Sequence, residues 1–108
     1  MQVSVTFKNI DPSEHLKNFV QEKLAKFDRL FNGPAEANVI LSVEKFRNIV
    51  DISLAADRLT INGKEENEDM YAAIDLVLDK IEKQIKKNKQ KIKDHHRASS
   101  RRSPKTTE

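Results

Sequence analysis

In the first part of the chain, the spacing of apolar residues changes from every second residue, as in a strand, to every third or fourth residue, as in a helix. Val3 to Phe7 alternates apolar and polar residues, which is typical of a strand buried on one face. Asp11-Pro12-Ser13-Glu14 then predicts a helix start, with Asp11 as the cap, Pro12 in the first turn and Glu14 at the capping-box position. Apolar residues recur every three or four positions as far as Phe31, and Asn32-Gly33-Pro34 ends the helix.

Three more strands and a second helix follow. The strands are predicted at about Ala37 to Glu44, Ile49 to Ala55 and Leu59 to Asn62, each with alternate apolar residues, and short polar links make them an antiparallel meander. Residues 64–68 are too polar to bury and are expected to form a loop. From Asp69 to about Asp94 the helical period returns, in the longest element of the chain.

The element order β-α-β-β-β-α indicates the α+β class. A right-handed crossover through the first helix would place the first strand parallel to the second, with the other two strands added antiparallel. Each helix has one apolar stripe and each strand one apolar face, so we expect a four-stranded sheet with two helices packed on one face. This domain is expected over residues 1–95, followed by a disordered basic tail over residues 96–108.

Composition limits the chain to one small core. It has 108 residues, 34% of them charged, and no cysteine, which excludes disulfides, thiolate metal sites and a cysteine nucleophile. The N-terminus does not resemble a secretory signal, and no apolar stretch approaches the ~20 residues of a membrane span. We therefore expect a cytoplasmic protein without a membrane partner.

No residue pattern indicates catalysis. Gly33 and Gly63 stand alone, so there is no glycine-rich phosphate loop, and no nucleophile elbow occurs. His15 and the adjacent pair His95-His96 lack the neighbouring ligands that a metal site needs. We expect a non-enzymatic protein with no metal, no cofactor and no small-molecule substrate.

The charge is distributed unevenly. Residues 1–75 carry nine basic and thirteen acidic side chains, a net charge of −4, whereas residues 76–108 carry eleven and four, a net charge of +7. Clustered positive charge of this kind favours a polyanionic partner such as RNA, DNA or an anionic membrane surface.

The lysines of the second helix divide into two groups. Asp79 with Lys83 and Glu82 with Lys86 form i,i+4 pairs in the favourable order, each contributing ~0.3 kcal/mol. Beyond Lys86 the lysines have almost no acidic neighbours, which favours a phosphate-binding helix over a merely solvated face. Each residue of an α-helix is rotated by 100° from the one before, which places lysines on both flanks of the apolar stripe. Lys80, Lys87 and Lys91 lie on one flank, and Lys86, Lys89 and Lys93 lie on the other.

Two lysines of the first helix extend this basic surface. Lys23 and Lys26 are expected to point away from the apolar stripe, and would join the second helix in one patch if the helices lie side by side. The chain offers almost no exposed aromatic side chain for base stacking. The patch therefore suits an RNA backbone better than a base-reading pocket.

The second helix also has coiled-coil spacing. Ile74, Leu78, Ile81, Ile85, Asn88 and Ile92 alternate by four and three residues, but over fewer than three heptads. Because the sheet needs a covering helix, we expect the N-terminal half of this stripe to pack in the core. The turns from about Asn88 onward should project beyond the sheet and be available to a partner or to RNA.

One segment of the second helix carries a family resemblance. Asp69-Met70-Tyr71-Ala72-Ala73-Ile74-Asp75, with the lysines that follow it, resembles the ribosome hibernation promoting factor and ribosome-associated inhibitor A family, also known as sigma-54 modulation proteins. Phe19-Val20 and Val43-Glu44-Lys45 are similar to the same family, and the likeness covers about residues 1–95.

The resemblance implies a fold similar to a double-stranded RNA-binding domain and a ribosomal partner. Members of the family bind the small (30S) subunit, alone or in the 70S ribosome, at the decoding region of 16S rRNA where messenger and transfer RNA pass. They block translation by steric occlusion during stress and stationary phase. Carried over by position, the residues that would face ribosomal RNA are Lys23, Lys26, Lys80, Lys83, Lys87 and Lys91, with Lys86 and Lys89 added on charge and geometry.

Length and tail composition suggest a place within this family. The chain resembles the short members, which lack the second domain that pairs ribosomes and would need a separate ribosome modulation factor to form 100S dimers. Inhibitor-type members have a longer, often acidic tail, whereas this tail is basic through Arg97, Arg101, Arg102 and Lys105. The hibernation-promoting type is therefore favoured.

Two other classes of function stay open at this stage. The domain could be a general double-stranded nucleic-acid binder, which would hold a plain RNA duplex as well as it holds ribosomes. It could also be a helix-mediated interaction module acting through Ile85 to Ile92, which would tolerate removal of charge but not Ile85→Asp.

Overall fold

The structure is a computed structural model that describes residues 1–97, with side chains described as far as Asn88. Its elements follow the predicted order. They are β1 (Gln2–Lys8), α1 (Glu14–Ala25), the short 3-10 helix η1 (Asp28–Leu30), β2 (Ala35–Glu44), β3 (Arg47–Ala56), β4 (Leu59–Asn67) and α2 (Met70–Arg97). The tail was predicted from residue 96, but residues 96 and 97 still belong to α2; the rest of the predicted tail, residues 98–108, lies outside the described residues.

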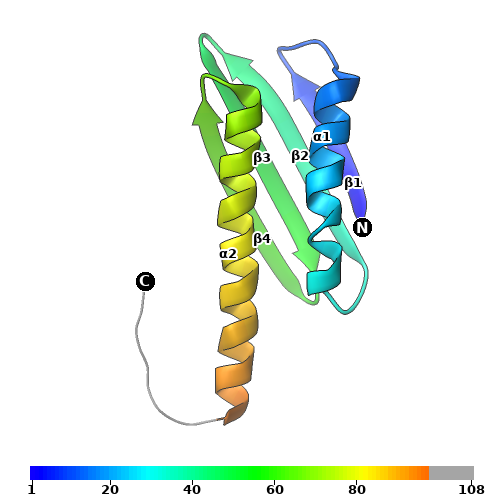
Figure 1. The fold of residues 1–108 in the computed structure, drawn as a ribbon, viewed down its shortest axis with the longest axis vertical. Coiled ribbons are helices and arrows are strands. Elements are labelled where there is room, and N and C mark those ends of the chain that lie inside the picture. The colour runs from blue at the N-terminus through cyan, green and yellow to red at the C-terminus, as the bar shows by residue number, and fades with distance from the viewer. Residues whose placement is uncertain (98–108) are drawn as a thin grey trace.

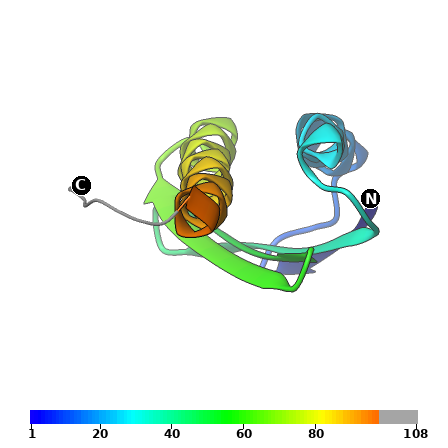
Figure 2. The same cartoon turned by 90° about the horizontal axis from the view of Figure 1, so that it is seen from below.

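The strands form one mixed sheet in the order β1-β2-β3-β4 (Figure 1). β1 runs parallel to β2, with Val5 opposite Val39, and the β2–β3 and β3–β4 pairs are antiparallel. Viewed along the helices, both α1 and α2 lie on the same face of the sheet (Figure 2). The α+β prediction, including the parallel crossover and the two helices on one face, is confirmed.

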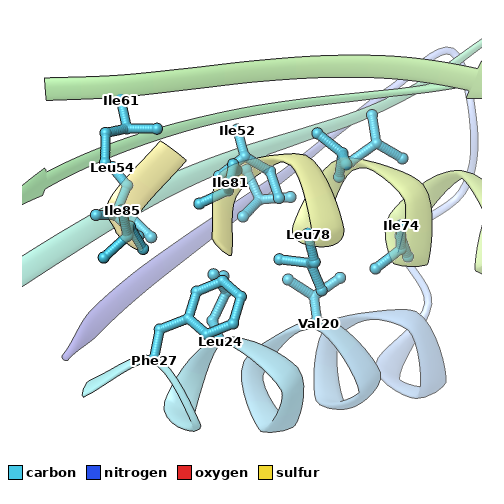
Figure 3. Close-up of a cluster of buried hydrophobic side chains, with 14 of the residues drawn as sticks. Val20, Leu24, Phe27, Ile52, Leu54, Ile61, Ile74, Leu78, Ile81 and Ile85 are labelled. Atoms are coloured by element: carbon cyan, nitrogen blue, oxygen red, sulfur yellow. The ribbon is translucent and has the colours of Figure 1, made fainter. Parts of the chain in front are cut away.

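The core lies between this face and the two helices (Figure 3). Alternate residues of β2, from Ala35 to Leu41, are buried, as the period of two requires. On α2, four of the five apolar residues with coiled-coil spacing, Ile74, Leu78, Ile81 and Ile85, are at most 5% exposed. Their predicted use in the core is therefore confirmed.

The first helix begins later than predicted. Ser13, and not Asp11, is the N-cap: it has extended dihedrals, and its hydroxyl oxygen accepts a hydrogen bond from the Leu16 amide at 3.2 Å. Pro12 therefore lies before the helix rather than in its first turn. Asp11 and Ser13 are both good N-cap residues, so residue type alone does not separate them.

The first helix also ends earlier than predicted. α1 stops at Ala25, and the chain tightens into η1 through short-range hydrogen bonds, from the Phe27 amide to the Leu24 carbonyl and from the Leu30 amide to the Phe27 carbonyl, both 2.9 Å. Phe27 and Phe31 both remain buried. Spacing by three and four residues does not distinguish a continued α-helix from a 3-10 turn, which has nearly the same period.

The predicted loop at residues 64–68 is wrong. β4 continues to Asn67, and Glu65 and Glu66 pair with Val50 and Ile49 of β3. Residues 64–67 keep their side chains exposed or half-buried while their backbone extends the ladder, so a polar stretch can belong to this strand. The other element boundaries differ from the predictions by a few residues.

Candidate nucleic-acid interface

The position of α2 depends on a close approach to β4. Gly63 faces the helix, and a Cβ atom at this residue would lie 2.9 Å from Val77 Cγ2 and 3.1 Å from Ile81 Cγ1. One turn further on, the Gln84 side-chain amide donates a hydrogen bond to the Asn62 carbonyl oxygen at 3.2 Å. These contacts hold the middle of α2 directly on the edge strand.

The C-terminal turns of α2 extend past the end of the sheet (Figure 1). Ile85 is the last core residue among the described side chains of the helix, and α2 continues for twelve more residues to Arg97. The predicted projection of this segment is therefore confirmed. The helix presents its last lysines beyond the body of the domain.

Four of the predicted site lysines are already paired with carboxylates. Lys83 Nζ lies 3.1 Å from Asp79 and Lys86 Nζ lies 3.1 Å from Glu82, which confirms both i,i+4 pairs. Sequence reasoning missed the other two pairs, Lys80 with Glu65 of β4 at 2.7 Å and Lys23 with Asp75 at 3.6 Å, because both join residues of different elements. All four lysine side chains remain at least 38% exposed, so each pair contributes only ~0–1 kcal/mol and a phosphate can compete for the lysine.

Lys23 lies in a different environment from the predicted one. Its ammonium group is 5.2 Å from the centroid of the Phe19 ring, and Phe19 in turn meets Tyr71 of α2 edge-on at a centroid distance of 4.9 Å. Lys23 therefore borders the apolar stripe and faces α2, whereas it was expected to point away from the stripe. Together with Asp75, these side chains link the two helices at their outer surface.

Two of the predicted lysines are free of such pairs. Lys26 and Lys87 are exposed, and within the described residues neither has a carboxylate within 4 Å. Lys89 and Lys91 lie on the next turns of α2, where the structure describes the backbone alone. Lys80, Lys83 and Lys86 are thus each paired with a carboxylate, and among the described side chains of α2 Lys87 is the first lysine without such a pair.

The expectation of almost no exposed aromatic side chain is wrong. Phe46, in the turn between β2 and β3, is 88% exposed, and Tyr71 is 42% exposed. The sequence places Phe46 next to an apolar strand, and only the position of the hairpin turn shows that its ring leaves the sheet.

A hollow beside β1 and α1 offers little to a small molecule. This hollow of about 160 Å³, lined by Met1, Val3, Gln21, Ala25 and Asp28, is smaller than the ~300–1,000 Å³ of ordinary ligand pockets. Over the part of the chain that the structure describes, no helix has both the length and the apolar character needed to cross a membrane.

The fold and the charge define an α+β domain whose longer helix ends in an excess of positive charge. Residues 3–93 match the family described as sigma 54 modulation protein / S30EA ribosomal protein, and the chain belongs to this family. The resemblance noted from the sequence is therefore confirmed.

Relatives and solved structures agree with this assignment. The chain is 38% identical over 95 residues to a ribosome hibernation promoting factor of Escherichia coli K12, covering 88% of this chain and all of the relative. A factor of the same name from Azotobacter vinelandii is 35% identical, with 84% of this chain and 85% of the relative covered. These names describe hibernation factors and not enzymes, which confirms the prediction of a non-enzymatic protein.

The fold is similar to two solved structures. The N-terminal domain of Thermus thermophilus Protein Y has a TM-score of 0.77 and 30% identity, with 81% of this chain and 98% of that chain covered. A ribosomal subunit interface protein from Coxiella burnetii has a TM-score of 0.73 and 28% identity, with 83% and 99% covered.

Proposed function

We propose that this protein is a ribosome hibernation factor that binds the small (30S) ribosomal subunit at the decoding channel, over the A and P sites, and inhibits translation. Family membership and the names of the relatives support the ribosomal partner and a cytoplasmic, ribosome-associated location. The observation that carries the proposal is the excess of lysines from Lys87 onward in the sequence, on turns of α2 that continue beyond the end of the sheet.

The proposed contact with 16S rRNA uses three kinds of lysine. Lys26 and Lys87 meet phosphates directly, since no described carboxylate neutralises them. Lys89 and Lys91 are assigned by their place on the projecting turns. The remaining residues of the set exchange a carboxylate for a phosphate on binding: Lys23, Lys80, Lys83 and Lys86.

The mechanism requires no bond to be made or broken. Lysines that contact phosphates release counterions, which provides binding energy that falls as salt concentration rises. The bound domain, with a longest dimension of 51 Å, then occupies space that messenger and transfer RNA need. Exclusion of these RNAs keeps the ribosome inactive and protected during stress and stationary phase.

Ribosome dimers belong to the same proposal. The protein would promote 100S particles together with a separate ribosome modulation factor, and the name of the relative, ribosome hibernation promoting factor, supports the hibernation role alone. Dimer formation is measured by sedimentation of 70S ribosomes mixed with the protein, with the modulation factor, or with both. Dimers that form only with both proteins are expected.

The central test compares two charge reversals of equal size. Lys87→Glu should weaken binding to purified 30S subunits about tenfold, equivalent to ~1.4 kcal/mol, and lower the salt dependence of binding. Lys8→Glu is the matched control, because Lys8 is exposed on β1, opposite Ser42 and away from α2. Equal affinities of the two variants, with native circular dichroism, would refute the proposed surface.

Competition separates the ribosome from nucleic acid in general. A plain RNA duplex should not displace the wild-type protein from 30S subunits at equal phosphate concentration, because the proposed site depends on the shape of the decoding channel. Effective displacement by the duplex would identify a general double-stranded nucleic-acid binder instead. The interaction-module alternative loses its first contact residue, since Ile85 is fully buried in the core.

A further inference from the structure

The turn between β2 and β3 has a composition that folding does not explain. Lys45 and Phe46 form a two-residue connection, and Lys45 adopts a φ of 56° in the left-handed region where glycine, asparagine or aspartate is favoured. Phe46 is 88% exposed and lies outside the core cluster. A strained lysine and a solvated ring at one turn are a departure from local rules, and such departures concentrate at functional positions.

Two ion pairs join the strands at the base of this hairpin. The guanidinium of Arg47 lies between two carboxylates, with Nη1 2.7 Å from Glu66 Oε1 and Nη2 3.1 Å from Glu44 Oε1. The hydrogen bond and charge of Glu66, with a smaller contribution from Glu44, raise the pKa of Arg47 above its usual value. The two strands stay paired up to Glu44 and Arg47, so the Phe46 ring projects from the end of a closed hairpin.

Acidic residues lie at the same end of the sheet as the exposed ring. The Asn48 side-chain amide donates to the Glu68 carbonyl oxygen at 2.7 Å, which holds the segment before α2 beside the hairpin. We call residues 44–47, together with Glu66, Glu68 and Asp69, the hairpin tip. It contains four carboxylates, of Glu44, Glu66, Glu68 and Asp69, and two cations, of Lys45 and Arg47.

The hairpin tip and the basic turns of α2 lie at opposite ends of the molecule (Figure 1). The molecule is 51 Å long, several times the ~8 Å screening length at physiological ionic strength, so the two ends act as separate electrostatic surfaces. An RNA backbone favours the basic end and is repelled by the net acidic tip. An exposed aromatic anchor with a carboxylate rim instead suits a positively charged protein surface with an apolar pocket.

We infer that the hairpin tip is a second docking surface, in which Phe46 inserts into an apolar pocket on a basic protein of the small ribosomal subunit. This inference rests on the proposed function, because it assigns the partner to the same particle. Proteins that fold against ribosomal RNA must neutralise phosphates with lysine and arginine, so the subunit presents basic protein surfaces beside its RNA. Docking at both ends would fix the orientation of the domain on the subunit, which charge attraction at one end alone does not do.

The test uses the full chain and measures binding to 30S subunits and, separately, to protein-free 16S rRNA. Phe46→Ser should weaken binding to subunits about tenfold, as expected for loss of an aromatic anchor, and leave binding to protein-free rRNA unchanged. Ile40→Thr is the matched control, because Ile40 is also an exposed apolar residue, 36% exposed, but lies outside the tip on the open face of the sheet. This control should bind as the wild type does.

Charge reversal in the tip distinguishes a protein partner from RNA. Glu68→Lys should weaken subunit binding several-fold if the partner is basic. If the ring stacks on an RNA base instead, Glu68→Lys would strengthen binding to 30S subunits and to protein-free rRNA, and Phe46→Ser would weaken binding to each of them. This result would overturn the inference. A benzoylphenylalanine photo-crosslinker at position 46 should accordingly label a subunit protein, and labelling of rRNA alone would also overturn the inference.

The outcomes keep the two proposals apart. If wild-type protein fails to bind 30S subunits at any salt concentration, the proposed function fails and the docking surface fails with it. If wild-type protein binds and Phe46→Ser binds equally well, only the docking surface is refuted. Native circular dichroism of Phe46→Ser is expected, because the ring contributes no core contact.

Discussion

A methyl group added at Gly63 tests whether close packing of α2 on β4 holds the domain together. Gly63→Ala places a Cβ atom 2.9 Å from Val77 Cγ2, and 3.1 Å and 3.3 Å from two carbon atoms of Ile81. All three neighbours belong to β-branched side chains that are fully buried, so neither side chain has free space to move into. The helix or the strand must shift by a few tenths of an ångström to relieve the contact.

The expected cost follows from two opposing effects. Overpacking of a filled core costs about 1–3 kcal/mol, whereas replacing glycine by alanine restricts the unfolded chain and returns ~0.4–1 kcal/mol. We expect Gly63→Ala to lower the free energy of unfolding by about 1–2 kcal/mol. For a domain of this size that corresponds to a decrease in melting temperature of about 5–10 °C.

Urea unfolding followed by circular dichroism measures this difference, and Gly33→Ala is the control. The nearest atom to a Cβ at Gly33 is Asp57 Oδ1 at 3.8 Å, an ordinary contact, so this variant should stay within about 0.5 kcal/mol of the wild type. Wild-type stability of Gly63→Ala would refute the close-approach argument. In the Val77→Ala background, which lacks the clashing methyl, the added cost of Gly63→Ala should be smaller.

Three further predictions concern single side chains. Ser13→Ala should lower the free energy of unfolding by ~1 kcal/mol in urea titrations because it removes the N-cap of α1, while Asp11→Ala should have almost no effect; the reverse ranking would contradict the observed cap. Arg58→Gly should raise the urea midpoint, with a gain of ~0.5–1 kcal/mol, because Arg58 has a φ of 67° in a turn where glycine is free of strain; a lower midpoint would show that the arginine side chain stabilises the turn. Asp75→Asn should change the free energy of unfolding by less than ~0.5 kcal/mol. It should strengthen binding to 30S subunits and steepen the salt dependence of binding, because it frees Lys23 for a phosphate. Unchanged binding in filter assays would exclude Lys23 from the interface.

The candidate site shows where sequence reasoning stops. The pairs Asp79–Lys83 and Glu82–Lys86 were predictable because a helix fixes the distance between residues four apart. The Lys80–Glu65 pair was not, since β4 was predicted to end before Glu65 and nothing local brings that strand to α2. The two kinds of pair look alike in the sequence, where each is only a lysine and a carboxylate.

The sequence by itself determined the element order, the buried faces and the excess of positive charge after Lys86. Each of these follows from a local period or from composition, which need no knowledge of distant neighbours. The sequence did not determine which lysines lack a carboxylate partner, where α1 is capped, or that the Phe46 ring points away from the sheet. Only the tertiary structure decided these points, because each depends on the register of one element against another, and that register is set by packing across the core.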